Sequence, residues 1–113
     1  MQKFNFNNKI FSLIENSEQG QVDSNTTFKY KQEDNLVTAN YFGGTIKYGK
    51  IIAILKNDEL NMLYQCITLK NELKAGKAIA KISLTGNNKI KLTLNWQWLD
   101  NKNETGISEY IEQ

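Results

Sequence analysis

Apolar and polar residues alternate with a period of two along most of the chain, as they do in β-strands that bury one face. The clearest example is residues 90–98, where Ile, Leu, Leu, Trp and Trp fill every second position, with Lys, Thr, Asn and Gln between them. Comparable segments cover residues 9–14, 26–31, 36–42, 45–55, 60–69, 77–84 and 107–111. The pattern therefore predicts about eight strands.

Turn-forming residues separate these segments at intervals of about ten residues, which is typical of antiparallel sandwiches and barrels. Short turns are expected at residues 33–35, 43–44, 57–58 and 86–88, and longer loops at residues 15–25, 71–76 and 100–106. No segment requires a helix. We therefore expect an all-β fold, in which residues 1–113 form a single small domain. It would be an antiparallel up-and-down meander, closed or nearly closed into a barrel.

Composition restricts the chemistry open to this domain. The 113 residues are 40% hydrophobic and 23% charged, with a net charge of +2, which is typical of a folded globular protein. The sequence contains no His, Arg or Pro, so all fourteen cationic side chains are Lys. Without His there is no imidazole base or His metal ligand, and Ser-His-Asp and Cys-His catalytic sites are excluded.

The single Cys66 cannot form a disulfide within the chain, which is compatible with a reducing compartment. The first twenty residues contain no apolar run like that of a signal peptide. The longest apolar run, residues 51–55, is far too short to cross a membrane as a helix. These features predict a cytoplasmic protein that does not enter a membrane.

Several short motifs resemble a family of bacterial proteins of about this length that often carry the name N-acetylglutamate synthase. They are Phe28-x-Tyr30-x-Gln32-x-x-x-Leu36, Tyr41-x-Gly43-Gly44, Tyr64-Gln65, Leu73-x-x-Gly76-Lys77, Trp96-Gln97-Trp98 and Gly106-Ile107-Ser108. The resemblance covers most of the chain. It implies a compact β-barrel similar to the streptavidin and lipocalin-like folds, and the name implies acetyl transfer.

The residues argue against the activity that the name implies. An acetyltransferase holds the pyrophosphate of acetyl-CoA on a glycine-rich turn at the start of a helix, where backbone N–H groups point at the phosphates. In this chain the glycines at 43–44, 49, 76, 86 and 106 fall in predicted turns or strands, and no βαβ unit is predicted. We therefore expect no cofactor and no catalytic residues, and an N-acetyltransferase remains the alternative.

Trp96 and Trp98 are the most distinctive candidates for a site, because their spacing puts both indoles on one face of a strand. They could form an aromatic plug that closes one end of the barrel. The alternative is that they line a ligand cup to which Tyr64 or Tyr41 adds a hydroxyl group. An eight-stranded barrel is just wide enough for either arrangement.

Three other features have simpler interpretations. Cys66, in the middle of a predicted strand, is expected to be a buried and unreactive thiol. Glu109 lies in phase with Ile107 and Ile111, which predicts that it faces inward and needs a Lys or Tyr partner. The polar row Thr93, Asn95 and Gln97 is expected to face solvent. No metal site is predicted.

Lysines also alternate with aromatic residues, as on surfaces that stack single-stranded nucleic acid. The residues are Lys29, Lys31, Lys47 and Lys50 with Phe28, Tyr30 and Tyr48. The near balance of fourteen cations and twelve anions favours solvated faces instead. Our leading hypothesis is a non-enzymatic barrel that binds a small molecule or a protein partner. Ligand contacts are expected at Trp96, Trp98, Tyr64 and Tyr41, and nucleic-acid binding is ranked last.

Overall fold

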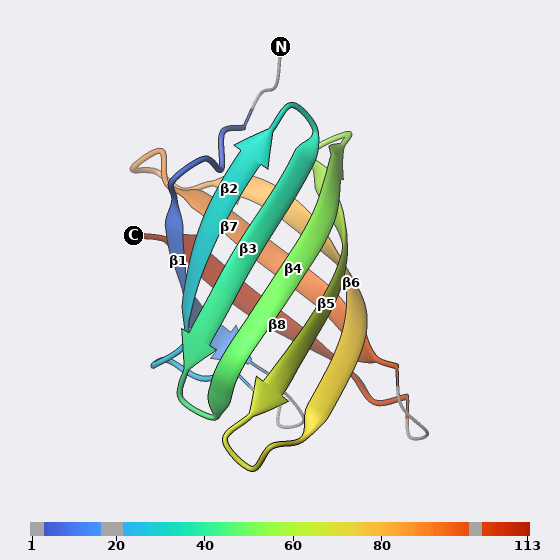
Figure 1. Cartoon of the computed structure of the whole chain (residues 1–113). Helices are drawn as coiled ribbons and strands as arrows, with labels where there is room; N and C mark the ends of the chain where they lie inside the picture. The colour runs from blue at the N-terminus through green and yellow to red at the C-terminus, as the bar shows by residue number, and fades with distance from the viewer. Residues whose placement is uncertain (1–3, 17–21, 100–102) are drawn as a thin grey trace.

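A computed structural model of the chain describes residues 4–16, 22–99 and 103–113. These form a closed barrel in which each strand pairs antiparallel with the next, and the last strand pairs with the first (Figure 1). The strands are β1 (Ile10–Asn16), β2 (Thr27–Glu33), β3 (Leu36–Gly43), β4 (Ile46–Lys56), β5 (Glu59–Thr68), β6 (Leu73–Leu84), β7 (Ile90–Trp98) and β8 (Thr105–Glu112). The predicted all-β meander of eight strands is confirmed, and the barrel is closed.

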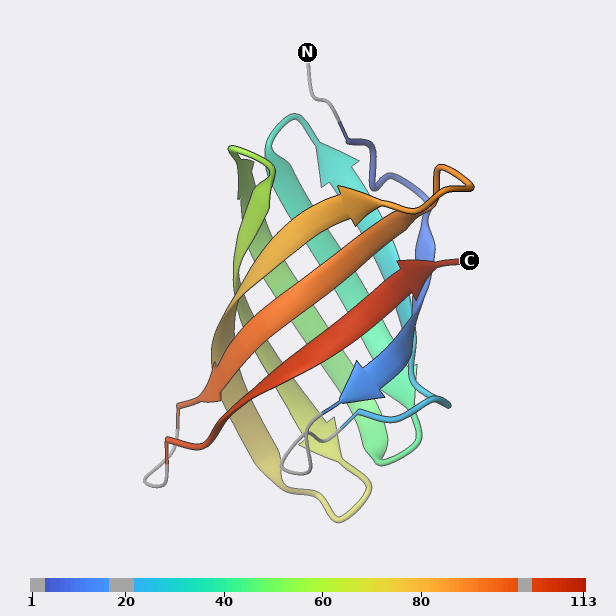
Figure 2. The ribbon, with the colours of Figure 1, turned by 180° about the vertical axis from the view of Figure 1, so that it is seen from behind.

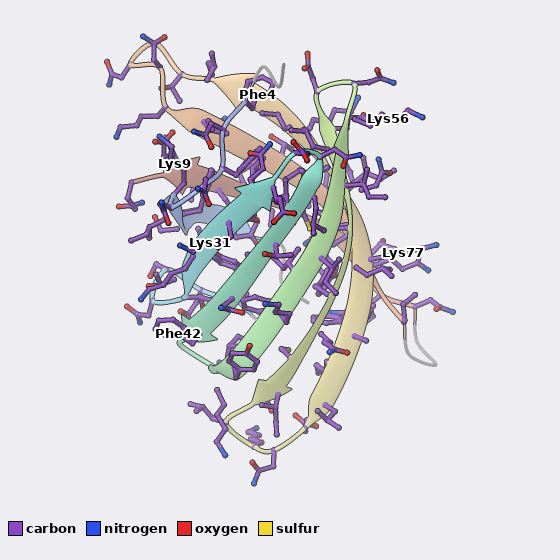
Figure 3. All side chains as sticks on the ribbon, turned by 45° about the horizontal axis from the view of Figure 1, so that its top comes forward. Phe4, Lys9, Lys31, Phe42, Lys56 and Lys77 are labelled. Carbon is purple, nitrogen blue, oxygen red and sulfur yellow. The ribbon has the colours of Figure 1, made fainter. Side chains whose placement is uncertain are left out.

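Alternation along each strand separates the core from the solvent. On β7 the residues Ile90, Leu92, Leu94, Trp96 and Trp98 are all buried inside the barrel. The intervening Thr93, Asn95 and Gln97 face outward, as predicted. The lysines labelled in Figure 3 also point away from the barrel wall. In a closed barrel every strand has a hydrogen-bonded neighbour on both sides, so no sheet edge is exposed. One apolar face on each strand is then enough to form the core.

The short turns lie where they were predicted. Asn57 and Asp58 both have positive φ, at 53° and 62°, which suits the right-handed twist of the strands that they join. Gly43 and Gly44, with φ of 109° and 63°, make the β3–β4 turn. In the longer predicted loops, residues 17–21 and 100–102 lie outside the described residues.

The predicted loop at residues 71–76 is partly wrong. Strand β6 already begins at Leu73, and its ladder with β5 runs from Leu73 opposite Ile67 to Lys81 opposite Glu59. Gly76 therefore lies inside a strand, opposite Tyr64. A glycine there looks like a loop residue in the sequence, but its neighbours gain backbone hydrogen bonds by extending the strand.

The segment before β1 covers one end of the barrel, a role that its sequence did not suggest. Phe4 and Phe6 are buried, and the ring of Phe6 lies 5.9 Å from that of Phe11 and 5.6 Å from that of Tyr30. The Phe6 N–H donates to Gln32 Oε1 at 2.7 Å, and the Asn8 N–H to the Tyr30 carbonyl at 3.0 Å. The segment therefore fills this end with aromatic side chains.

The two ends of the barrel are thus different. The N-terminal segment lies at the end that carries the β2–β3 and β4–β5 turns (Figure 1). The opposite end, called the distal end below, carries the β3–β4 turn and the β5–β6 and β7–β8 connections (Figure 2). None of the described residues forms a helix long and apolar enough to cross a membrane.

Candidate functional site

The four predicted ligand residues come together around one partly open cavity of about 40 Å³ inside the barrel. Trp96 and Trp98 reach it from β7, Tyr64 from β5 and Tyr41 from β3. The other lining residues are Val22, Phe28, Ile46, Ile51, Met62, Cys66, Leu94, Ser108 and Tyr110. Because Ile46 begins β4 and Trp98 finishes β7, the cavity lies toward the distal end.

Both indoles point into the barrel, which settles the direction that the sequence left open. Trp96 is 6% exposed and Trp98 is 5% exposed, and their ring centroids are 6.0 Å apart. Trp98 also packs edge-to-face against Tyr64, with centroids 5.6 Å apart and planes at 71°. The buried Trp96 Nε1–H donates to Ser108 Oγ at 2.7 Å. The pair therefore packs against neighbours and still borders the cavity.

Three of these aromatic rings lie over a glycine on the neighbouring strand. Tyr41 pairs with Gly49, Tyr64 with Gly76 and Trp96 with Gly106 in the strand registers. A Cβ atom built on any of these three glycines would meet carbon atoms of its partner's ring. The absent side chain lets each ring lie close against the barrel wall, which positions the ring and leaves room beside it.

The polar groups around the cavity are neutral. The Tyr41 hydroxyl donates to the Gln65 carbonyl at 3.3 Å, and Tyr110 is hydrogen-bonded to Ser108. Burial raises the pKa of Tyr41, Tyr64 and Tyr110 well above the usual value for a phenol. These hydroxyls therefore stay protonated and offer hydrogen bonds without charge.

Cys66 is buried at the same site, as predicted. Burial raises the pKa of its thiol, and a hydrogen bond with Tyr41 and the charge of Lys74 offset only part of this shift. A protonated thiol is a poor nucleophile. Cys66 is therefore part of the cavity wall.

Lys74 belongs to the site as well, although it was not among the predicted site residues. It occupies an inward-facing position at the start of β6, in phase with the buried Gly76 and Ala78, and it is half-buried. Its ammonium Nζ lies 5.1 Å from the centroid of the Trp98 ring. The period-two spacing of residues 74, 76 and 78 could have indicated that Lys74 faces inward. This spacing was not recognised because residues 71–76 were predicted to form a loop.

The prediction that Glu109 faces inward is wrong. Ser108 and Tyr110 are the buried residues of this part of β8, while Ile107 is exposed and Glu109 is half-buried on the outer face. The Glu109 carboxylate pairs with Lys91 Nζ at 3.1 Å and accepts from Thr93 Oγ1 at 3.3 Å. The Trp96 ring occupies the space inside β8, so small residues, Gly106 and Ser108, face it there.

The proposed stacking surface for nucleic acid loses most of its aromatic residues. Phe28 and Tyr30 are buried in the core, while Lys29 and Lys31 of the same strand face solvent. Of the three aromatics considered, only Tyr48 is exposed. Within the described part of the chain, no group of three or more Asp, Glu, Cys or His side chains could hold a metal ion.

The chain was compared with models of protein families. The model of a family described as avidin-like protein matches residues 4–113, which is nearly the whole chain. No curated protein and no solved structure matches the chain. The match agrees with the streptavidin-like barrel expected from the sequence motifs, but it gives no support to the N-acetylglutamate synthase name.

Proposed function

The chain belongs to the avidin-like family, and from this membership and the geometry of the barrel we propose that it binds a small molecule. The proposed ligand site is the cavity bordered by Trp96, Trp98, Tyr64 and Tyr41. The observation that carries the proposal is the convergence of aromatic rings and neutral hydroxyls on one internal space. Ligand pockets typically combine apolar walls with a few well-placed polar groups in this way.

The ring and glycine pairs support a cavity that is built into the fold. A barrel of this size could be filled by aliphatic side chains. Instead, Tyr41, Tyr64 and Trp96 lie over glycines, so their rings follow the wall rather than the axis. The side chains available to widen the space are Met62, which is flexible, and the half-buried Val22.

The lining residues also define the chemistry of the bound group. None of the described residues around the cavity is Lys, Asp or Glu, so the group buried there should be uncharged. Aromatic faces favour a flat group, and the hydroxyls of Tyr41, Tyr64 and Tyr110 offer hydrogen bonds to its edge. We therefore expect a compact, planar, neutral head group such as an amide or a heterocycle.

Nuclear magnetic resonance can test this directly, because the only two tryptophans of the chain both border the cavity. A library of small planar amides and heterocycles would be titrated while the two indole N–H signals are followed. We expect some members to shift both signals saturably. The variant Cys66→Met, which fills the cavity, should abolish the shifts, whereas Ser83→Met on the exposed outer face of β6 should not. Signals that no fragment moves at millimolar concentration would refute the proposal.

A second candidate is contact with another copy of the chain. A groove of about 960 Å³ crosses the outer wall of β4–β8, and it is lined by Ile52, Ile54, Leu63, Ile79 and Ile107, each 45–62% exposed. Between them lie neutral side chains, with Lys77 as the one charged residue of the lining. Two such faces can meet with little charge repulsion, and the burial of these exposed apolar side chains would favour association.

Light scattering after gel filtration would test this candidate. We expect the mass to increase with concentration toward that of a dimer or higher oligomer. The change Leu63→Lys should shift the chain to the monomer, while Leu84→Lys, at an exposed leucine outside the groove, should leave the mass unchanged. A monomeric mass at every concentration would remove this candidate.

A further inference from the structure

Three leucines, called the distal leucines below, are exposed at the distal end of the barrel. Leu69 is 62% exposed, Leu73 is 83% exposed and Leu99 is 52% exposed. Leu69 and Leu73 flank the β5–β6 connection, which is the lowest part of the ribbon in Figure 1, and Leu99 directly follows β7. Exposed apolar side chains that gather in one place mark a contact surface for a protein or a membrane.

Backbone contacts place the distal leucines along one stretch of the barrel rim. Leu73 and Leu99 line a surface groove of about 420 Å³ beside Tyr48, on the outside of β4–β6. Leu69 lies at the other side of the connection, where its N–H donates to the Thr45 carbonyl at 2.9 Å. Apolar side chains therefore border the rim from the start of β4 to the end of β7.

The β5–β6 connection is held in place by its own polar groups. The buried Thr68 accepts from the Glu72 N–H at Oγ1, at 3.2 Å, and its own N–H donates to the Glu72 carbonyl at 2.9 Å. The Thr68 carbonyl accepts from the Asn71 N–H, also at 2.9 Å. A connection fixed in this way loses little conformational entropy when a partner covers its leucines.

Three lysines, called the distal lysines below, lie near the distal leucines. Lys47 and Lys50 are in β4, and Lys70 is in the β5–β6 connection. Lys47 Nζ donates to Asn71 Oδ1 and Lys50 Nζ donates to Asn40 Oδ1, each at 3.1 Å. These bonds to neutral amides hold both ammonium groups in place without cancelling their charge, and further N–H groups stay available to an anion.

The groove beside the distal leucines is positively charged. Lys50 and Lys74 line it, and none of its described lining residues is Asp or Glu. Asp23 and Glu104 lie outside this lining. The exposed Glu72 of the β5–β6 connection opposes the binding of an anion, so its removal provides a test of the opposite sign.

We propose that the distal end docks on the surface of a bilayer that contains anionic lipid. The distal leucines enter the headgroup layer, and the distal lysines bind lipid phosphates. Such binding increases with the apolar area inserted and with the number of basic residues near the lipid. Charge favours this partner over a second copy, because two such surfaces would bring lysine against lysine. The contact does not depend on a ligand in the cavity.

Flotation of the whole chain with lipid vesicles tests this proposal. We expect binding to vesicles of phosphatidylcholine with phosphatidylglycerol, and much weaker binding to phosphatidylcholine alone. Added salt should weaken the binding to anionic vesicles. Leu73→Trp places an indole at the rim, and its emission should shift to shorter wavelength with anionic vesicles because the ring leaves water. Leu84→Trp, at the opposite end of β6, should show no such shift.

Further variants separate the two kinds of contact. Lys70→Gln should weaken vesicle binding about fivefold, as expected for one lysine near an anionic surface. Leu73→Ser should weaken it about tenfold, because less apolar surface is buried. The matched controls Lys56→Gln and Leu84→Ser lie at the opposite end and should change nothing (Figure 3 labels Lys56). Glu72→Gln should strengthen binding, which a folding defect cannot do. The two indole N–H signals check the fold of every variant.

Three results would overturn the proposal. They are no binding to anionic vesicles, equal binding to both kinds of vesicle, and binding that Lys70→Gln and Leu73→Ser leave unchanged. If vesicles do not bind but the chain self-associates, and Leu73→Ser abolishes this association, the distal leucines contact a second copy instead of a bilayer.

Discussion

At the scale of single residues, the site depends on three glycines, because each lacks the side chain that would otherwise fill the space beside an aromatic ring. Gly49, Gly76 and Gly106 each lie opposite an aromatic residue, and each leaves the space into which that ring folds. Each glycine therefore helps to fix the position of the aromatic ring opposite it. Substitution at the glycine should disturb the cavity even though no ligand touches that residue.

We expect Gly76→Ala to push the Tyr64 ring out of its place, because the new Cβ would meet ring atoms of Tyr64. Overpacking of this kind costs about 1–3 kcal/mol of the free energy of unfolding. Urea denaturation measures this loss, and fragment binding should weaken in parallel. Gly86→Ala is the control, because a Cβ there has no neighbour within 4 Å. Equal effects of the two changes would contradict the role of the ring contact.

Alternation alone was enough to predict that Trp96, Trp98, Tyr64 and Tyr41 belong together, since each lies on the inward phase of its strand. It could not predict the glycine pairs, because these depend on the register between strands. Gly76 shows the difficulty, since its sequence context suggested a loop. Lys74 was missed for the same reason, and a lysine in an inward phase was not expected.

At the scale of elements, the N-terminal segment has a larger role than its sequence suggests. Phe4 and Phe6 are separated by a polar residue and precede a short strand, so nothing local marks them as core residues. Only the closed barrel beside them provides an apolar surface to cover. Similarly, Ile107 and Ile111 suggested the wrong inner face for β8, because the Trp96 ring fills the space beside Gly106 and Ser108 on the inner face.

Phe6→Ala should strongly destabilise the barrel, because the fully buried ring packs on Phe11 and Tyr30. The expected loss is about 3–5 kcal/mol in the free energy of unfolding, as for other buried phenylalanines. Thermal and urea unfolding would measure it. Phe42→Ala on the outer face of β3 is the matched control and should cost much less. A tolerated Phe6→Ala would mean that the segment is not part of the core.

At the scale of the whole molecule, one ion pair joins the two ends of the described chain. Lys9 Nζ lies 2.8 Å from Glu112 Oε2, and the Ile90 N–H donates to Glu112 Oε1 at 2.9 Å. Burial opposes ionisation of Glu112, but the hydrogen bonds from Lys9 and Ile90 and the lysine charge outweigh it. The pKa of this carboxyl is therefore lowered.

This shift predicts a specific pH dependence. A lowered pKa in the folded state stabilises the barrel above the ordinary carboxyl pKa of about 4.3, and the stabilisation is lost as the pH falls through the lower folded value. Glu112→Gln should therefore be less stable than the native chain at pH 7, and the difference should shrink in acid. Unfolding curves at several pH values would measure this, with Glu33→Gln on an exposed position as the control. A difference that does not change with pH would exclude the ion pair as its source.

The closure of the barrel also affects when the chain can fold during synthesis. Lys9 and Glu112 meet across a sequence separation of 103 residues, so the pairing of β1 with β8 must wait until β8 has left the ribosome. Until then the growing sheet has two unpaired edges, which can associate with other nascent chains. Contacts of such long range also slow folding. Translation of the final strand, rather than the collapse of the early hairpins, is therefore the step after which the nascent protein is protected from aggregation.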